Sequence, residues 1–367
     1  GEWIDLRMLS YEFVILEVNG AGCEFGLDDI YWDGGGTGSV TVDYNEGWNM
    51  VGLPLQVDDA QYQNLFSEAY TGALYSYDGT YNVEEELTIG TGYLIRLSDG
   101  GTVEFSGTTI DDLTISLTEG WNLISGISTS LPVDVLYNSD LVVSNGIYAF
   151  DGSYYNASTI DPGMGYWVRA LADGDVTLSS SSSMGKTVPI VNHFSDANTL
   201  ELSNGTHSAT LYFGKDVAEE HRNSYSLPPT FPQMAFDVRF NGDMKYAFES
   251  GDIEVLNASD NLTISYDVVL DAGEHMNWVL SSSGGEEYIL EGTGTITIPS
   301  SERFVLNREP VIPITFVLHQ NYPNPFNPIT SLRYDLPEQA QVTLTVYDLM
   351  GKEIIRLINT IQEAGYK

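Results

Sequence analysis

Histidine and cysteine are the side chains most often recruited for catalysis or metal binding, and this 367-residue chain has few of either. Its histidines are widely separated, with neither a His-Glu-x-x-His motif nor a paired zinc spacing. The only cysteine, Cys23, follows no basic residue that would stabilise a thiolate. No Gly-x-Ser-x-Gly motif is present, and no glycine-rich phosphate loop follows an expected strand. We therefore expect that this chain is not an enzyme and has no catalytic residues.

Carboxylates are so numerous that their spacing alone identifies no site. There are 52 acidic and 14 basic residues, which gives a net charge of −38. This excess excludes nucleic acid and anionic membrane surfaces as electrostatic partners, because both need a basic surface. Three clusters of carboxylates could supply oxygen ligands to calcium: Asp28-Asp29, Asp111-Asp112 and Asp173-Gly174-Asp175. None of them matches an EF-hand loop. The alternative interpretation is a solvated acidic surface. Metal-ligating residues therefore stay unknown, and no other cofactor is expected.

The clearest pattern along the chain is a duplication with a constant offset of 73 residues. Three segments recur at that offset: Glu46–Met50 as Glu119–Leu123, Tyr75–Tyr81 as Tyr148–Tyr154, and Gly92–Arg96 as Gly165–Arg169. We interpret residues 38–112 and 113–184 as two copies of one unit. Because a unit of this size buries little surface alone, we expect the copies to pack against each other.

Each copy is expected to consist mainly of strands. Apolar and polar residues alternate in Val40–Val42 and Leu113–Leu117, the period of a half-buried strand. Asp78-Gly79 and Asp151-Gly152 predict tight hairpin turns, since glycine tolerates positive φ. The stretch Asp58–Ala69 is expected to form one short helix starting on Asp58, with a weaker counterpart at Pro132–Asn138.

Two arginines are the candidate binding residues of the copies. Arg96 and Arg169 are the only basic residues between positions 38 and 184, and they occupy equivalent positions. One interpretation is structural, with each guanidinium paired to a carboxylate of its own copy, Asp78 or Asp151. The other is contact with an anion or with the carboxylate of a glycan.

Trp48 and Trp121 are a second pair of candidate ligand contacts. Aromatic rings at such positions either anchor a core or stack on a sugar ring. Both interpretations also apply to the tyrosines that recur near them, at positions 75, 77, 81, 93, 148, 154, 155 and 166.

The rest of the chain predicts further β modules. Residues 1–37 contain two expected strands, Tyr11–Val18 and Leu27–Trp32, and an acidic pair within an apolar last strand is similar to the closing strand of jelly-roll carbohydrate-binding modules. A serine run at 179–183 predicts a linker. Residues 185–310 predict a β-sandwich, with strands at Ala209–Phe213, Ala235–Phe240, Ile253–Leu256, Leu262–Val269, Trp278–Leu280, Tyr288–Leu290 and Thr295–Ile298. The predicted fold is all-β, with several sandwich- or barrel-like modules in tandem.

Residues 311–367 carry an unusual spacing of prolines and aromatic residues. Pro323, Pro325 and Pro328 favour an extended backbone, and Tyr322 and Phe326 are expected to anchor it. Val342, Leu344 and Val346 should share one face of a strand, which a turn at Asp348–Gly351 joins to a second strand starting near Ile354.

This C-terminal segment resembles the type A sorting domain of the type IX secretion system of Bacteroidota and their relatives. The resemblance runs from about Phe316 to Lys367 and rests on these residues: Tyr322, Pro323, Asn324, Pro325, Phe326, Asn327, Pro328, Thr330, Tyr334, Leu336, Pro337, Tyr347, Asp348 and Gly351. In that family further strands follow the Ala364-Gly365 element, so the segment is interpreted as a partial, Ig-like sorting domain of a longer protein. The segment Leu227–Pro229, followed by Ala235–Phe240, is similar to the β domain that often precedes it.

The resemblance implies a secreted or outer-membrane cell-surface location and type IX secretion machinery as a partner. No apolar run approaches the roughly 20 residues of a membrane-spanning helix. We expect a non-catalytic structural or adhesive segment, with surface glycans or other surface proteins as further candidate partners. The alternative is an accessory carbohydrate-binding stalk of a secreted hydrolase whose catalytic domain lies upstream. The sequence does not identify a ligand or an oligomeric state.

Overall fold

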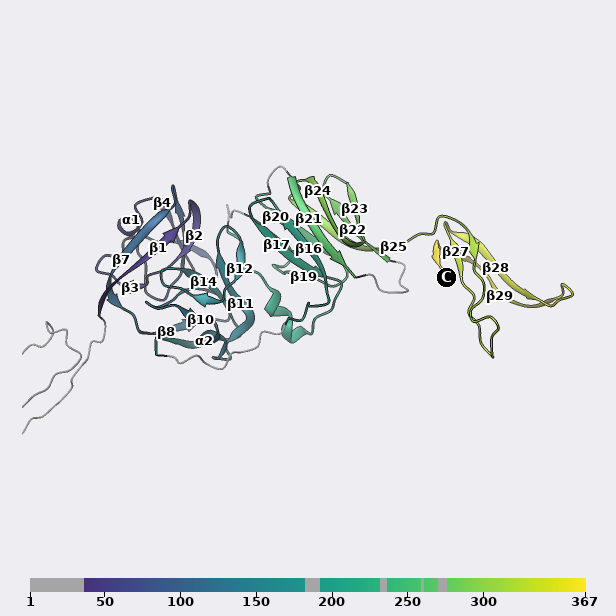
Figure 1. The fold of residues 1–367 in the computed structure, drawn as a ribbon, viewed down its shortest axis with the longest axis horizontal. Helices are drawn as coiled ribbons and strands as arrows, with labels where there is room; N and C mark the ends of the chain where they lie inside the picture. The colour runs from purple at the N-terminus through teal and green to yellow at the C-terminus, as the bar shows by residue number, and fades with distance from the viewer. Residues whose placement is uncertain (1–35, 182–191, 232–235, 259–260, 270–275) are drawn as a thin grey trace, which may run out of the picture. The chain divides into compact units, whose positions relative to one another are not determined.

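The computed structural model describes residues 36–181, 192–231, 236–258, 261–269 and 276–367. About 56% of the chain is strand and 5% is helix, which confirms the predicted all-β fold (Figure 1). The strands expected within residues 1–35 lie outside the described residues.

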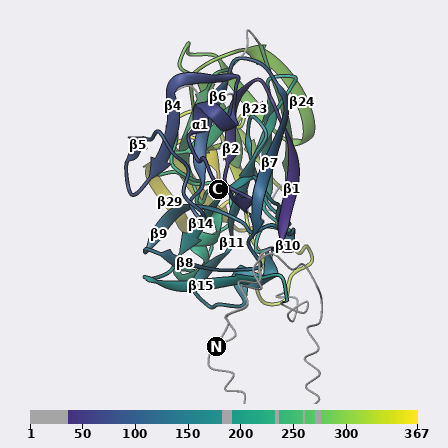
Figure 2. The ribbon, with the colours of Figure 1, turned by 90° about the vertical axis from the view of Figure 1, so that its left-hand side faces the viewer.

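Residues 37–109 form two antiparallel sheets. One has the order β1-β7-β3 and the other β2-β6-β4-β5; Figure 2 shows β1 beside β7, its pairing partner. The strands are β1 (Thr37–Tyr44), β2 (Gly47–Val51), β3 (Leu55–Gln56), β4 (Ala69–Tyr77), β5 (Tyr81–Val83), β6 (Tyr93–Leu97) and β7 (Gly101–Thr109). Leu74, Ile95 and Phe105 are fully buried in the core that these strands enclose.

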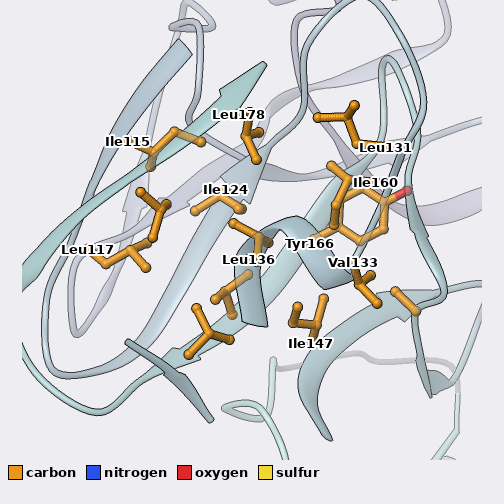
Figure 3. Close-up of a cluster of buried hydrophobic side chains, with 14 of the residues drawn as sticks. Ile115, Leu117, Ile124, Leu131, Val133, Leu136, Ile147, Ile160, Tyr166 and Leu178 are labelled. Carbon is orange, nitrogen blue, oxygen red and sulfur yellow. The ribbon is translucent and has the colours of Figure 1, made fainter. Parts of the chain in front are cut away.

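Residues 112–179 repeat this arrangement. The main sheet has the order β12-β11-β14-β9, β8 pairs with β15, and β10 pairs with β13. The bounds are β8 (Asp112–Leu117), β9 (Gly120–Ser125), β10 (Leu131–Pro132), β11 (Val142–Phe150), β12 (Tyr154–Asn156), β13 (Thr159–Ile160), β14 (Gly165–Ala170) and β15 (Gly174–Ser179). Figure 3 shows the core of this copy, where Leu178, Ile124 and Leu136 approach one another from different elements.

The local turn predictions hold, whereas the helix prediction is too long. Gly79 and Gly152 adopt φ values of 104° and 106° in the β4–β5 and β11–β12 connections, which confirms both Asp-Gly turns. The helix expected within Asp58–Ala69 is a single turn, α1 (Tyr62–Leu65), because Phe66 turns extended and enters the core. Its counterpart is α2 (Asp134–Tyr137).

The two copies meet through reciprocal contacts between equivalent residues. Gly52 N–H donates to the Gly163 carbonyl at 3.0 Å, and Ser125 N–H donates to the Gly90 carbonyl at 3.0 Å. In both bonds the donors are 73 residues apart, and so are the acceptors. The β-bridges Val51–Met164 and Thr91–Ile124 show the same exchange. The interface is therefore self-complementary, like that of a two-fold dimer built within one chain.

Residues 198–310 form two five-stranded sheets, with orders β19-β17-β16-β21-β24 and β18-β20-β25-β22-β23 (Figure 1). The bounds are β16 (Asn198–Ser203), β17 (Ser208–Phe213), β18 (Asp237–Phe240), β19 (Tyr246–Ala247), β20 (Gly251–Leu256), β21 (Asn261–Val268), β22 (Met276–Ser282), β23 (Glu287–Leu290), β24 (Gly292–Pro299) and β25 (Arg303–Pro310). Sequence patterning missed β16, β19 and β25. A 3₁₀ helix, η1 (Glu219–Tyr225), precedes the segment that enters the functional site.

The C-terminal residues form a small sheet, β26-β27-β30, and a separate hairpin, β28-β29. The bounds are β26 (Val317–Leu318), β27 (Tyr334–Leu336), β28 (Ala340–Tyr347), β29 (Glu353–Gln362) and β30 (Gly365–Tyr366). The predicted turn at Asp348–Gly351 is confirmed, with Gly351 N–H bonded to the Asp348 carbonyl at 3.0 Å. Tyr322 and Phe326, the residues expected to anchor the proline-containing segment, are 73% and 55% exposed. None of the helices in the described part of the chain has the length and apolar character needed to cross a bilayer.

Candidate functional site

The largest concentration of aromatic side chains lies where the two copies meet. Twelve residues of the copies form one cluster, in six pairs that are each 73 positions apart: Trp48/Trp121, Met50/Leu123, Tyr75/Tyr148, Tyr77/Phe150, Tyr81/Tyr154 and Leu94/Trp167. They come from equivalent strands, β2, β4, β5 and β6 in the first copy and β9, β11, β12 and β14 in the second. We call this surface the aromatic cleft.

A segment of the following sandwich occupies the aromatic cleft. Leu227 and Phe231 belong to the same cluster, and Pro228 is buried with them. Each proline fixes its own φ near −65° and disfavours helix at the residue before it, so Leu227-Pro228-Pro229 stays extended. Leu227 N–H is bonded to the Asp243 carbonyl at 2.7 Å, which ties the start of the segment to its own domain.

Phe231 inserts into a cage made only of first-copy rings. Its ring centroid lies 4.4 Å from that of Trp48, 4.8 Å from Tyr81 and 5.1 Å from Tyr75, all edge-to-face. Edge-to-face contacts place the positive ring edge against the negative face of a neighbour, which adds to the gain from burial. Only 6% of Phe231 is exposed.

The Pro229 carbonyl oxygen is held by both copies at once. The hydroxyls of Tyr81 and Tyr154, which occupy equivalent positions, each donate to it at 3.2 Å. Trp167 Nε1–H donates to the Tyr154 hydroxyl at 3.1 Å, which fixes that hydroxyl's orientation. Burial raises the pKa of both tyrosines, so each remains a protonated donor at neutral pH.

Arg239 on β18 supports the segment from the sandwich side. Its guanidinium donates to the Pro228 carbonyl at 2.8 Å, to Asp237 at 2.5 Å and to Asp243 at 2.7 Å. Burial lowers the pKa of this guanidinium, but the two carboxylates outweigh burial and the pKa is raised overall. Arg239 is only 2% exposed, so it is a fixed strut rather than a mobile surface charge.

On the second copy, the ring equivalent to Tyr75, that of Tyr148, faces a cation instead of a phenyl ring. Lys245 Nζ lies 4.5 Å from the centroid of the Tyr148 ring and donates to Asn156 Oδ1 at 3.3 Å. Tyr148 and Tyr75 are equivalent residues, so the two halves of the cleft have the same framework with different occupants. Burial lowers the pKa of Lys245 to about 8, and Asp237 partly opposes that shift.

Polar contacts extend the docking of the sandwich along the second copy. Phe236 N–H donates to the Gly152 carbonyl at 3.1 Å, and the His207 ring nitrogen Nε2 lies 3.1 Å from the Asp151 carbonyl. Arg169 Nη2 donates to Asn223 Oδ1 of η1 at 3.0 Å. The Asp-Gly turn of the second copy is thus part of the contact.

The four candidate ligand contacts from the sequence all make contacts within the chain. Trp48 and Trp121 lie in the cleft, and the Arg169 guanidinium lies 5.5 Å from the Trp121 ring centroid. The pairing of Arg169 with Asp151 is wrong, because Asn223 takes its place. The Arg96 guanidinium lies 5.2 Å from the ring centroid of Tyr70, on β4.

None of the sorting-motif residues belongs to the aromatic cleft. Residues 322–331 form a loop closed by reciprocal backbone bonds between Tyr322 and Ser331, and the loop contains Pro323, Asn324, Pro325, Phe326, Asn327, Pro328 and Thr330. Tyr334 hydroxyl donates to Gln362 Oε1 at 2.7 Å, and Leu336 is buried just before Pro337. The Asp348 carboxylate caps the β28 hairpin next to Gly351, beyond the exposed Tyr347.

The occupant of the cleft escaped sequence reasoning. The sequence indicates Leu227–Pro229 only as part of a β domain and Arg239 only as part of the expected strand Ala235–Phe240, and it gives no signal for Phe231 or Lys245. The one available signal was the recurrence of aromatic residues at six equivalent positions, which indicates a shared surface but not its occupant.

The described residues contain no cluster of three or more histidine, cysteine, aspartate or glutamate side chains placed to hold a metal ion. Comparisons with protein-family models, curated proteins and solved structures find no match to this chain. The arrangement of the cleft is chemically suited to holding an extended, proline-containing segment by aromatic packing and two hydroxyl donors.

Proposed function

We propose that this chain is a non-catalytic structural or adhesive segment of an extracellular or cell-surface protein. The observation that carries the proposal is the use of the repeated aromatic positions. Both copies direct these side chains into one cleft, where they pack on Leu227–Phe231 of the next domain. A duplicated unit that clamps its neighbour acts as a spacer with a fixed joint.

The same observation weighs against a sugar-binding stalk. Carbohydrate platforms need an exposed aromatic face, whereas Trp48 contacts Phe231 and Trp121 contacts Tyr148, Trp167 and Arg169. Surface glycans and other surface proteins remain candidate partners for other faces of the molecule.

The export part of the proposal is supported by the motif of residues 322–351 and its resemblance to type IX sorting domains. In this proposal the chain reaches the outer surface through the type IX translocon, and is then attached there or released.

The test is localisation of the full gene product in its host, with and without a functional type IX translocon, read by protease treatment of intact cells. We expect surface cleavage in the parent strain and periplasmic retention in the translocon mutant. A cytosolic location, or equal surface exposure in both strains, would contradict the export proposal. A periplasmic control protein should resist the protease in both strains.

A further inference from the structure

The contacts in the aromatic cleft separate into a receptor and a ligand. Every receptor residue lies between positions 48 and 167, whereas the groups that enter its cluster or accept from its tyrosine hydroxyls come from residues 227–231. Lys245, outside this segment, contacts only the Tyr148 ring of the cleft. The ligand side is also simple: two buried apolar side chains, one backbone carbonyl and one phenyl ring. Thr230, between Pro229 and Phe231, is exposed. The receptor therefore fits the pattern Leu-Pro-Pro-x-Phe.

This mode of contact is one by which proteins recognise peptides. Aromatic grooves bind proline-rich segments because an extended polyproline backbone loses little conformational entropy on binding. A free carbonyl on such a segment needs a donor when it is buried. Tyr81 and Tyr154 supply two donors to the Pro229 carbonyl.

The receptor and the ligand lie on different, complementary surfaces of one chain. Such a pair is heterologous: it closes within one molecule, or it joins the cleft of one molecule to the segment of the next. Each copy of the protein necessarily carries both halves. The covalent tether favours the closed form, because a short tether supplies an effective concentration on the order of 1 mM.

We propose that the aromatic cleft is a recognition site for Leu-Pro-Pro-x-Phe segments and that a second copy of this chain supplies the segment, so that copies link head to tail. This goes beyond the proposed structural role, and it does not depend on the route of export. The link between two molecules uses the same contacts that join the cleft to residues 227–231 within one molecule. It forms when the segment leaves the cleft of its own chain.

Two variants that each lose one half of the contact provide the test. The cleft variant carries Trp48→Ala, Tyr81→Phe and Tyr154→Phe and keeps its segment. The segment variant carries Pro228→Gly, Pro229→Gly and Phe231→Ala and keeps its cleft. Each variant alone should be a monomer near 40.4 kDa by light scattering. An equimolar mixture should form a 1:1 complex of twice that mass, since one intact cleft then meets one intact segment.

Competition identifies the contact in that complex. An excess of the peptide Ser-Leu-Pro-Pro-Thr-Phe should dissociate the complex, whereas the same peptide with alanine in place of phenylalanine should not. A mixture that stays monomeric at about 1 mM, near the effective concentration of the tether, would overturn the proposal. A complex that the first peptide does not dissociate would also overturn it.

If circular dichroism shows that the triple variants do not fold, a pair of variants with fewer substitutions keeps the test valid. Tyr81→Phe with Tyr154→Phe then serves as the cleft variant, and Phe231→Ala alone serves as the segment variant. The same two outcomes decide the proposal. Wild-type protein concentrated to about 1 mM should also contain a dimer fraction that grows with concentration.

Discussion

Truncation of Phe231 to alanine should destabilise the joint between the duplicated unit and the sandwich. The ring is 6% exposed and touches Trp48, Tyr75 and Tyr81 edge-to-face. Removal of a buried phenylalanine ring costs about 3–5 kcal/mol in protein cores. Because the site lies between modules and can partly close, we expect the lower end, about 3 kcal/mol.

Urea unfolding followed by tryptophan fluorescence measures this loss. Trp48 reports the event directly, since its ring centroid lies 4.4 Å from that of Phe231. Phe248→Ala is the matched control, because this ring belongs to the same domain but is 47% exposed; its effect should stay within about 0.5 kcal/mol. If Phe231→Ala changed the free energy of unfolding by less than about 1 kcal/mol, the cage would not carry the joint, and the reasoning would fail.

Three further predictions address the copy interface, the buried Arg239 and the half-buried Lys245. Gly92→Ala should lower the free energy of unfolding in urea by about 1–3 kcal/mol, because the added Cβ would lie 2.4 Å from the Ile124 carbonyl oxygen. The control Gly101→Ala should lower it less, because a Cβ at that position has no atom within 4 Å. Arg239→Ala should lower the free energy of unfolding by about 3–5 kcal/mol, because it leaves Asp237 buried without its partner. The control Arg303→Ala should lower it by less than about 1 kcal/mol, because Arg303 is exposed and its pair with Glu254 spans 3.6 Å. Lys245 has a pKa of about 8 in the folded chain and 10.5 unfolded, so the unfolded state binds more protons between those values and stability should rise from pH 8 to pH 10. Lys245→Met should flatten that rise in pH-dependent thermal unfolding; an unchanged slope would contradict the assignment.

Local features of the fold could be predicted from the sequence because their causes are local. The Asp-Gly turns depend on glycine at positive φ, and the alternation at Leu113–Leu117 depends on one buried face. Helix α1 was overestimated because polar residues after Asp58 favour helix, while Phe66 gains more by burial in the core. Tertiary packing outweighed propensity there.

The site itself could not be predicted, because its contacts join residues far apart in the chain. Tyr81 and Pro229 are separated by 148 positions, and no pattern within either segment indicates the other. Arg169 illustrates the same limit, since Asp151, the carboxylate that the repeat suggests as its partner, is not its partner. An amide on η1, which sequence patterning did not anticipate, is its partner.

The pseudo-symmetry of the cleft explains why a duplicated surface binds one segment. Two equivalent tyrosine hydroxyls reach the same Pro229 oxygen at equal distances, so that oxygen lies near the axis relating the copies. A single peptide has no two-fold symmetry, so its residues on either side of the axis must meet the same framework with different groups. The first-copy cage accordingly holds Phe231, whereas the ring of Tyr148 faces Lys245. Sequence divergence between the copies can thus adjust each side separately. Tyr81→Phe should lower the free energy of unfolding in urea by about 0.5–1.5 kcal/mol, because it removes one bond to the Pro229 oxygen. Tyr154→Phe should cost more, because it also leaves the buried Trp167 N–H without its acceptor. An unchanged free energy of unfolding in Tyr81→Phe would contradict this account.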